Sequence, residues 1–251
     1  MSKSEKNIVA IIQARMGATR LPGKVMMEID GISLLKIMLS RVMKSKLLDK
    51  VIIATSTSPL DNKIEDFCKM NGYESFRGSE NDVLSRYYEC AKKYNADVIV
   101  RLTADCPLID PLVIDKLIKL YFESSVDYGA NTVPPETSTF PDGSDVEVFS
   151  IRALEKANTV AHDPKDREHV TFYFWKYNNG FKTVQLNCNE DWSKYRFTVD
   201  YPEDFDVIKC IMKELSKRNI FGHLKDIIEI FDLNPEIKQK NEKYYFGVGW
   251  E

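Results

Sequence analysis

The sequence has few cysteines and no surplus of positive charge. Its five cysteines are odd in number, widely spaced and free of any Cys-x-x-Cys pair, which argues against a disulfide framework and against a zinc site of the usual spacing. The formal net charge is -3, whereas broad nucleic-acid binding normally shows as a basic surplus. We therefore expect a cytoplasmic protein, from a reducing compartment, that binds no nucleic acid.

Long apolar runs are also lacking. The first apolar run, Asn7 to Ile12, follows a polar N-terminus and is too short for a signal-peptide core or a membrane span, so we expect no membrane partner. The glycines match neither of two familiar phosphate loops. Five residues rather than four separate Gly17 from Gly23, which departs from the P-loop, and no Gly-x-Gly-x-x-Gly dinucleotide fingerprint occurs.

Strand-like and helical patterns alternate through the first half of the chain. Apolar runs predict strands over 7–12, 50–54 and 97–102, and periodicity with capping residues such as Ser33 predicts helices over 33–44, 61–71, 82–94 and 111–123. Strands that alternate with helices need crossover connections. The pattern therefore predicts an α/β fold with a mainly parallel central sheet.

The pattern changes in the second half. Residues 130–143 are rich in proline, threonine and serine and predict a loop, and residues 168–177 are rich in aromatic side chains. Further predicted elements are strands over 145–149 and 195–199, helices over 202–217 and 223–231, and a tail with Tyr244, Tyr245, Phe246 and Trp250 that docks on the protein body or on a partner subunit. We expect a single domain over residues 1–251 in which residues 130–190 form an insertion.

A basic turn follows the first predicted strand. The stretch "QARMGATRLPGKV" holds Arg15, Arg20 and Lys24 and no acidic residue. The carboxyl edge of an open α/β sheet is where ligands bind, because free backbone N–H groups are exposed there. Three unpaired cations at that edge favour a polyanion such as a triphosphate, and the alternative is a solvated basic turn.

Two acidic residues end later strands in the same way. Asp105 follows a strand in "VIVRLTADCPLIDP", and Asp200 follows one in "YRFTVDYPEDF". Adjacent parallel strands lie about 5 Å apart, so these carboxylates can converge on one or two Mg²⁺ ions of a bound triphosphate. The alternative role for each is a helix N-cap, although Asp110 and Asp204 are better placed for capping.

With these motifs the sequence resembles a known enzyme family. The stretches "IIQARMGATRLPGKV", "LTADCPLIDP", "FPDGSDVEVFS", "DREHVT" and "FTVDYPEDF" occur in the order of the cytidylyltransferases that act on acylneuraminate or 3-deoxy-manno-octulosonate, and span most of the chain. The resemblance is greatest to the branch of spore coat polysaccharide biosynthesis protein F. It implies a Rossmann-like, glycosyltransferase-A-type nucleotidyltransferase fold.

The resemblance also implies which residues bind the nucleotide. Arg15 and Lys24 would act on the phosphates of CTP with help from Arg20, and Asp105 and Asp200 would hold Mg²⁺ as catalytic metal ligands. The nucleotide-binding set is Ala14, Arg15, Met16, Gly17, Arg20, Lys24, Gly78, Ser79, Thr103 and Ala104. The family often has Ser where this chain has Ala18, so a backbone N–H would have to replace that hydroxyl.

The resemblance places the acceptor in the middle of the chain. The implied acceptor-binding set is Asp142, Asp145, Glu147, Arg167, Glu168 and His169. The guanidinium of Arg167 suits the carboxylate of a 2-keto-3-deoxy sugar acid, because its fork binds both oxygens. The alternative is that "DREHV" is a solvated helix start. The family commonly dimerises through this region, which implies a homodimer.

The expected reaction is transfer of CMP from CTP to such a small acceptor, with release of pyrophosphate, for surface polysaccharide biosynthesis. Two alternatives stay open. A glycosyltransferase of the same fold class usually carries an Asp-x-Asp motif, whereas here Asp105 is followed by Cys106 and Pro107. A nucleotide-binding protein without catalytic activity would need neither the basic turn nor the paired acids.

Overall fold

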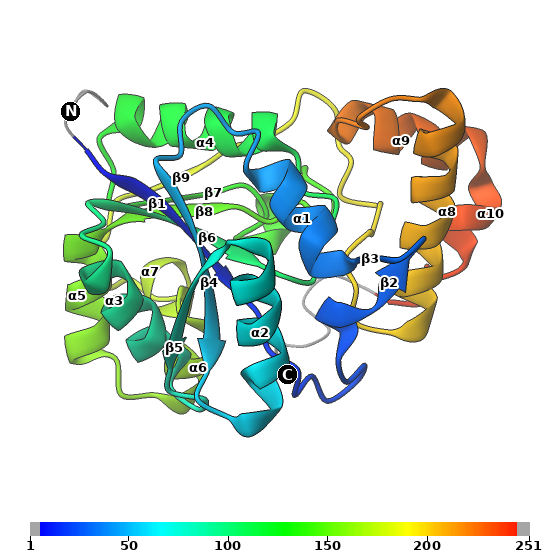
Figure 1. Ribbon diagram of the computed structural model, residues 1–251. Helices are drawn as coiled ribbons and strands as arrows, with labels where there is room; N and C mark the ends of the chain where they lie inside the picture. Colours follow the sequence, from blue (N-terminus) through cyan, green and yellow to red (C-terminus); the bar gives the residue numbers. More distant parts are fainter. Residues whose placement is uncertain (1–5, 245–251) are drawn as a thin grey trace.

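A seven-stranded sheet runs through the centre of the computed structural model, which describes residues 6–244 (Figure 1). The strand order is β5-β4-β1-β6-β8-β7-β9, with bounds Ile8–Gln13 (β1), Lys50–Ser56 (β4), Glu74–Gly78 (β5), Val98–Thr103 (β6), Tyr128–Ala130 (β7), Glu147–Ser150 (β8) and Thr183–Gln185 (β9). The pairs β5-β4, β4-β1, β1-β6 and β7-β9 are parallel, and β8 is antiparallel to both neighbours. The predicted α/β fold with a mainly parallel sheet is confirmed.

The apolar run of β1 is explained by burial on both faces. Ile8, Ala10 and Ile12 pack into one hydrophobic core, and Val9 and Ile11 pack into a second core on the opposite side of the sheet. A strand buried on both faces shows no alternation of apolar and polar residues. The carboxyl end of β1 lies in register with its neighbours, since Gln13 pairs with Ala54 of β4 and with Thr103 of β6.

Helices cover both faces of the sheet (Figure 1). One face carries α1 (Leu34–Val42), α2 (Asn62–Asn71) and α4 (Pro111–Ser124), and the other carries α3 (Val83–Lys93), α5 (Ile151–Val160), α6 (Pro164–His169) and α7 (Phe172–Trp175). To one side lie α8 (Pro202–Arg218), α9 (Leu224–Leu233) and α10 (Pro235–Gln239), near the hairpin of β2 (Glu28–Ile29) and β3 (Ile32–Ser33). The short 3₁₀ helices are η2 (Lys24–Met26), η3 (Pro59–Asp61) and η4 (Pro135–Thr137).

Two predicted capping residues are confirmed. The Ser33 hydroxyl accepts from Lys36 N at the start of α1, and the Asp110 carboxylate accepts from Leu112 N at the start of α4. Of the aromatic tail, Tyr244 stacks on Tyr201 with ring centroids 3.8 Å apart. The other tail residues of the prediction, Tyr245, Phe246 and Trp250, lie outside the described residues.

The strand predicted over 195–199 is wrong. This extended segment forms a single β-bridge, between Arg196 and Asp142, and no ladder. Its backbone N–H groups bond to loops instead of to a strand, because Phe197 N donates to Asp142 O and Val199 N donates to Asp105 O. The sequence analysis also lacked the helices α5, α7 and α10 and five short strands, β2, β3, β5, β7 and β9.

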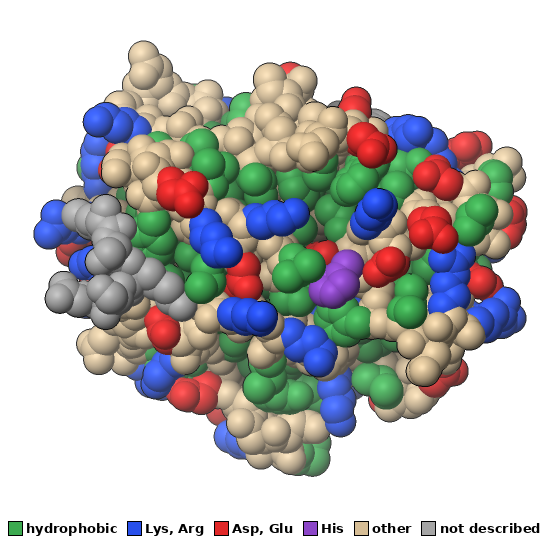
Figure 2. All heavy atoms as spheres, turned by 90° about the horizontal axis from the view of Figure 1, so that it is seen from above, with side chains coloured by type: hydrophobic (Ala, Val, Ile, Leu, Met, Phe, Trp, Pro, Cys, Tyr) green, Lys and Arg blue, Asp and Glu red, His purple; other side chains and the backbone are tan. Residues whose placement is uncertain are grey.

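The face seen in Figure 2 carries charge of both signs. Basic and acidic side chains are interspersed over its described residues, in keeping with the small formal net charge of -3. Within residues 6–244, none of the helices combines the length and the apolar character needed to cross a bilayer.

Candidate functional site

A cavity of about 380 Å³ lies at the carboxyl ends of β1 and β6. Its walls come from the loop after β1, from β6 and the loop that follows, and from segments near residues 142–145, 168–169 and 196–200. Ligands of open α/β sheets bind at this edge, where strand ends and loop backbones are exposed. The position makes this cavity the candidate site.

The loop after β1 is held by two backbone contacts at Met16. Gly23 N donates to Met16 O at 2.9 Å, and Met16 N donates to Asp61 Oδ1 at 2.7 Å. Gly23 adopts φ +73°, which favours glycine, and a Cβ there would lie 3.3 Å from the Met16 side chain. This closure starts η2 at the next residue and turns the Lys24 side chain inward, where it is buried.

Lys24 joins the two acids that the sequence placed at strand ends, Asp105 after β6 and Asp200 after the extended segment 195–199. Its Nζ lies 3.1 Å from Asp105 Oδ2 and 2.9 Å from Asp200 Oδ1, and it donates to Val199 O at 2.7 Å. An ammonium has three hydrogens, so these three contacts use its whole donor capacity. Arg20 adds a longer ion pair to Asp200 Oδ1, at 3.3 Å.

The charges of this cluster support one another. Burial by itself would lower the pKa of Lys24, but the charges of Asp105 and Asp200 outweigh it and raise that pKa. Burial by itself would raise the pKa of Asp105, but the charge of Lys24 and hydrogen bonds from Thr103 and Lys24 lower it to about 2. Lys24 and Asp105 are therefore both charged at neutral pH.

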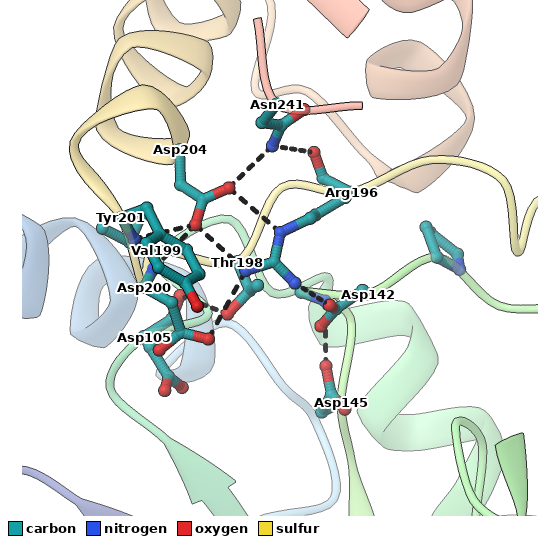
Figure 3. Close-up of polar contacts among 12 residues, drawn as sticks. Asp105, Asp142, Asp145, Arg196, Thr198, Val199, Asp200, Tyr201, Asp204 and Asn241 are labelled. Atoms are coloured by element: carbon teal, nitrogen blue, oxygen red, sulfur yellow. Dashed lines mark hydrogen bonds and ion pairs between the residues drawn. The ribbon is translucent and has the colours of Figure 1, made fainter. Parts of the chain in front are cut away.

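Arg196 holds the acidic side of the cluster together (Figure 3). Its Nε and Nη2 donate to the two carboxylate oxygens of Asp204, each at 3.0 Å, and its Nη1 donates to Asp142. A longer contact of 3.4 Å joins Nη2 to Asp200 Oδ2. Figure 3 shows the Arg196 side chain reaching between Asp204 and Asp142, with Asp105 and Asp200 side by side.

Neither strand-end acid caps a helix. The cap of α4 is Asp110, and the start of α8 is capped at Tyr201 with Asp204, whose carboxylate accepts from the backbone N–H groups of Asp200 and Tyr201. The capping role weighed for Asp105 and Asp200 is therefore excluded by the structure. Asp204 fills its expected first-turn role, and it binds Arg196 as well.

The chemistry of the pair suits Mg²⁺ held together with phosphate. Within residues 6–244, no group of three His, Cys, Asp or Glu side chains gathers closely enough to hold a metal ion by itself. Magnesium is commonly bound by one or two carboxylates, waters and substrate phosphates rather than by an all-protein cage. Asp105 and Asp200, whose oxygens share the Lys24 ammonium, fit that kind of ligand set.

Many of the residues expected from the sequence line the cavity together. All three loop cations, both acids expected to hold metal, two further residues of the nucleotide set and four of the acceptor set are among them: Arg15, Arg20, Lys24, Asp105, Asp200, Thr103, Ala104, Asp142, Asp145, Glu168 and His169. They come from segments up to 185 positions apart in the chain, between Arg15 and Asp200. The fold thus collects the expected phosphate end and the expected acceptor end in one space.

Other expected residues do not belong to the cavity lining. Of the nucleotide set these are Ala14, Met16, Gly17, Gly78 and Ser79, and of the acceptor set Glu147 and Arg167. Ala14 is buried in the core, Gly17 is exposed on the loop, and Gly78 ends β5 against the Arg86 side chain.

Arg167 is occupied elsewhere. Its Nε and Nη2 donate to the carboxylate of Asp82, at 3.0 and 2.6 Å, and its Nη1 donates to the carbonyl oxygens of Asn158 and Ala161. Asp82 caps α3, so this arginine joins α3 to α6. The structure therefore does not bring Arg167 to the cavity, because its guanidinium is used to connect helices.

The cavity also contains residues that the sequence analysis missed. These are Gln13, Thr19, Leu21, Val83, Arg101, Cys106, Arg196 and Thr198. The lining also includes Val25, which packs into the core, and Ala18, which the sequence analysis discussed. Gln13 ends β1, and its Oε1 is buried with no hydrogen-bond partner among the described residues. Position at the carboxyl end of a predicted strand was the signal that could have singled out Gln13.

A strained turn places His169 at the cavity. Val170 has φ +64° and ψ -54°, which a β-branched residue rarely adopts, and Thr171 N donates across it to His169 O at 2.6 Å. The imidazole stacks on Phe172 with centroids 4.3 Å apart. Burial lowers the pKa of His169, so the ring is neutral at pH 7 and can accept a proton.

Comparison with known proteins gives a consistent result. A cytidylyltransferase family model matches residues 9–245. The spore coat polysaccharide biosynthesis protein SpsF of Bacillus subtilis (strain 168) is 32% identical over 243 residues, which cover 94% of this chain and 98% of that protein. The solved structure of a cytidylyltransferase from Leptospira borgpetersenii serovar Hardjo-bovis is 38% identical, with a TM-score of 0.87 over 96% of this chain and 100% of that one.

A more distant solved structure shares the fold. It is a CMP:2-keto-3-deoxy-manno-octonic acid synthetase complexed with CTP, with a TM-score of 0.59 over 82% of this chain and 98% of that one. Sequence identity is 16%, so this likeness concerns the arrangement of strands and helices. It extends the agreement from sequence to architecture.

Proposed function

The chain belongs to the cytidylyltransferase family, and from that premise we propose that it transfers CMP from CTP to a hydroxyl of a 2-keto-3-deoxy sugar acid, releasing pyrophosphate. The observation that carries the proposal is the meeting of the loop cations with Asp105 and Asp200 around Lys24 in one cavity. The product would be an activated sugar for surface polysaccharide synthesis.

The loop after β1 binds the triphosphate in this proposal. Arg15, which lines the cavity, and Arg20 offer guanidinium groups whose geometry suits phosphate oxygens. Lys24 joins them once phosphate oxygens replace its contacts to the acids. Cationic donors fixed before the reaction stabilise charge that accumulates on phosphate oxygens, which is the main source of catalysis in such transfers.

Asp105 and Asp200 would hold Mg²⁺ with the phosphates. When bound there, the ion supplies positive charge against the reacting phosphate oxygens. Arg196 contacts Asp200 Oδ2 at 3.4 Å and donates to Asp142, the pKa of which is raised well above its ordinary value by burial and by the charge of Asp145. The fixed geometry of these carboxylates is this chain's contribution to metal binding.

The chemical step is an in-line displacement. An acceptor oxygen forms a bond to the α-phosphorus of CTP, the bond from that phosphorus to the bridging oxygen breaks, and pyrophosphate leaves with the bonding electrons. The acceptor hydroxyl gives up its proton, for which the neutral imidazole of His169 is the proposed base. Glu168, Asp142 and Asp145 line the same end and offer acceptors for sugar hydroxyls.

The test is a matrix of the four ribonucleoside triphosphates against sugar acids, with 3-deoxy-manno-octulosonate and N-acetylneuraminate as the first acceptors and pyrophosphate as the readout. We expect pyrophosphate release that requires both CTP and a sugar acid, with formation of a CMP-linked product. Release without an acceptor, or equal release with ATP, GTP and UTP, would contradict the proposal.

The same assay separates the rival functions. A glycosyltransferase would release a nucleotide from a nucleotide sugar and no pyrophosphate from CTP. A nucleotide-binding protein without catalytic activity would bind CTP in calorimetry, with or without Mg²⁺, and yield no pyrophosphate with any acceptor.

A further inference from the structure

Arg101 is a cavity-lining cation that lies outside the basic loop. It stands on β6, four positions before Asp105, and faces the same side of the sheet as α3. His169 lines the same cavity, and the charge of Arg101 contributes to the lowered pKa of that imidazole after burial. Arg101 therefore belongs to the end of the cavity assigned above to the acceptor.

Neighbouring strands fix the Arg101 side chain. In the antiparallel ladder Arg101 lies opposite Glu147 of β8, and its Nη1 donates to Glu147 Oε2. The other carboxylate oxygen of Glu147 accepts from the Tyr128 hydroxyl of β7. The guanidinium carbon lies 5.8 Å from the ring centroid of Tyr87. A side chain whose guanidinium is already held in place loses little further entropy when it binds a ligand.

The guanidinium of Arg101 still has donors to offer. Within the described part of the chain, Nη1 is its one nitrogen with a hydrogen bond, and Nε is buried without a partner. Arg167, which the sequence analysis assigned to the acceptor, and Arg196, which also lines the cavity, differ in this respect. All three guanidinium nitrogens of Arg167 and of Arg196 donate to carboxylates, carbonyls or an amide oxygen.

Stability does not explain such an arrangement. The Arg101 and Glu147 side chains are 16% and 6% exposed, and a buried ion pair adds little net stability because desolvation costs about as much as the attraction returns. An anchored arginine with open donors in a cavity is instead suited to bind an incoming anion, since its planar group can bond two oxygens. The partner of Arg101 is then a ligand and not another protein group.

We propose that Arg101, anchored by Glu147 and Tyr128, binds the carboxylate of the acceptor and so selects 2-oxo acids over neutral sugars. The inference rests on the proposed function for the identity of the acceptor. It assigns the acceptor carboxylate to Arg101 instead of Arg167. Arg101 lies on β6 and lines the cavity together with Glu168 and His169, and it does not belong to the loop after β1 that is proposed to bind the triphosphate. The residue is therefore a determinant of acceptor binding, with little effect on CTP.

The first experiment uses kinetics. Arg101→Gln and the double variant Arg101→Gln with Glu147→Gln are compared with wild type, using 3-deoxy-manno-octulosonate and its C1 amide as acceptors. We expect the acceptor KM to rise about 10- to 100-fold for the acid, as for a lost hydrogen bond to a charged group. The CTP KM should stay within twofold, and the amide should be used about equally by all three proteins.

The double variant keeps the result interpretable, because it leaves no buried Glu147 charge unpaired. A melting temperature close to wild type for this variant shows that the fold is intact. Arg101→Lys, which keeps the charge but not the fork, should lie between wild type and Arg101→Gln. Equal KM values for the acid in wild type and the double variant would overturn the proposal.

A second experiment does not depend on the acceptor. Pyruvate, the smallest 2-keto acid, is titrated into the protein saturated with Mg²⁺ and a non-hydrolysable CTP analogue, with binding followed by ligand-observed NMR. Binding that weakens tenfold or more in the double variant supports the anion site. No binding to wild type, or equal binding to both, overturns it. Arg101-dependent pyruvate binding without pyrophosphate release from any sugar acid would instead show that the proposed function is at fault.

Discussion

Lys24 Nζ lies 2.9 Å from Asp200 Oδ1 and also forms an ion pair with Asp105, so one ammonium group balances both carboxylates. The ammonium has no hydrogen left for a phosphate, because Val199 O accepts the third one. Phosphate binding by Lys24 and its bridging of the two acids are therefore competing roles. In the proposed function, phosphate binding by Lys24 requires that at least one of its three present contacts breaks.

Replacing Lys24 with methionine tests that competition. Lys24→Met removes the cation that pairs with both Asp105 and Asp200. Binding of Mn²⁺ alone should tighten by about tenfold, because a nearby charge of the same sign as the metal is lost. The affinity for CTP should fall by about the same factor, since a charge-assisted contact to phosphate is lost. Electron paramagnetic resonance of free Mn²⁺ measures the first effect, and calorimetry measures the second.

Lys116→Met, an exposed position on α4, is the matched control and should change neither affinity. Unchanged Mn²⁺ binding in Lys24→Met would mean that the lysine does not compete with a metal for the two acids.

Neutralising either strand-end acid should slow the reaction. Asp105→Asn or Asp200→Asn is expected to reduce magnesium-dependent turnover by roughly a hundredfold or more, since a metal contribution of several kcal/mol is lost at about 1.4 kcal/mol per tenfold. The double variant should be little worse than either single one, because the two side chains act as a unit. Steady-state pyrophosphate release as a function of Mg²⁺ measures this, with exposed Asp206→Asn as the control. Turnover like that of wild type in both single variants would exclude the assignment.

Arg196 should matter for folding as well as for activity. Arg196→Gln leaves the fully buried Asp204 and its neighbour Asp142 without their cation, so the free energy of unfolding should fall by about 3 to 5 kcal/mol. Denaturant unfolding measures the change. Arg218→Gln breaks a more exposed ion pair with Glu229 and should cost less than about 1 kcal/mol. A similar cost for both variants would contradict a central role for Arg196.

Arg167 was expected to bind the acceptor carboxylate, but its contacts indicate a role in stability. Arg167→Ala removes the bonds to Asp82, Asn158 and Ala161, so the free energy of unfolding should fall by about 1 to 3 kcal/mol. The acceptor KM should change less than threefold, since the guanidinium is not at the cavity. A large, selective rise in acceptor KM would restore Arg167 as an acceptor ligand.

The lowered pKa of His169 sets the sign of a pH effect. Burial disfavours the charged imidazolium and lowers the pKa of His169 below its ordinary value of 6.5. The imidazole is therefore neutral, and able to accept a proton, at pH 6.5 and above. The rate at saturating CTP should therefore fall only in acid below that value. His169→Gln should slow turnover about a hundredfold and remove the acid limb of the pH profile. An acid limb that persists in this variant would assign it to another group.

The sequence predicted the central sheet because its signals are local. The run Ile8–Gln13 is apolar on both faces, and a basic turn follows it, so both the strand and its ligand-binding end could be recognised. Strands β7 and β9 have three residues each, and β5 is rich in polar residues, so no periodic pattern marked them. The 195–199 segment is the opposite case, because a strand was predicted there although the backbone N–H groups of this segment bond to loops.

By itself, the sequence determined the fold class, the cationic loop and Asp105 at the end of β6, since neighbouring residues and strand periodicity encode these features, and it singled out Asp200 although the strand predicted before that residue is absent. The homodimer and the insertion over residues 130–190 stay predictions. Only the tertiary structure decided that Lys24 bridges the acids, that Arg196 orders them and that Arg101 rather than Arg167 has open donors. Those roles depend on partners far along the chain, such as Glu147, 46 positions after Arg101, and no local pattern records which distant side chain will share a charge.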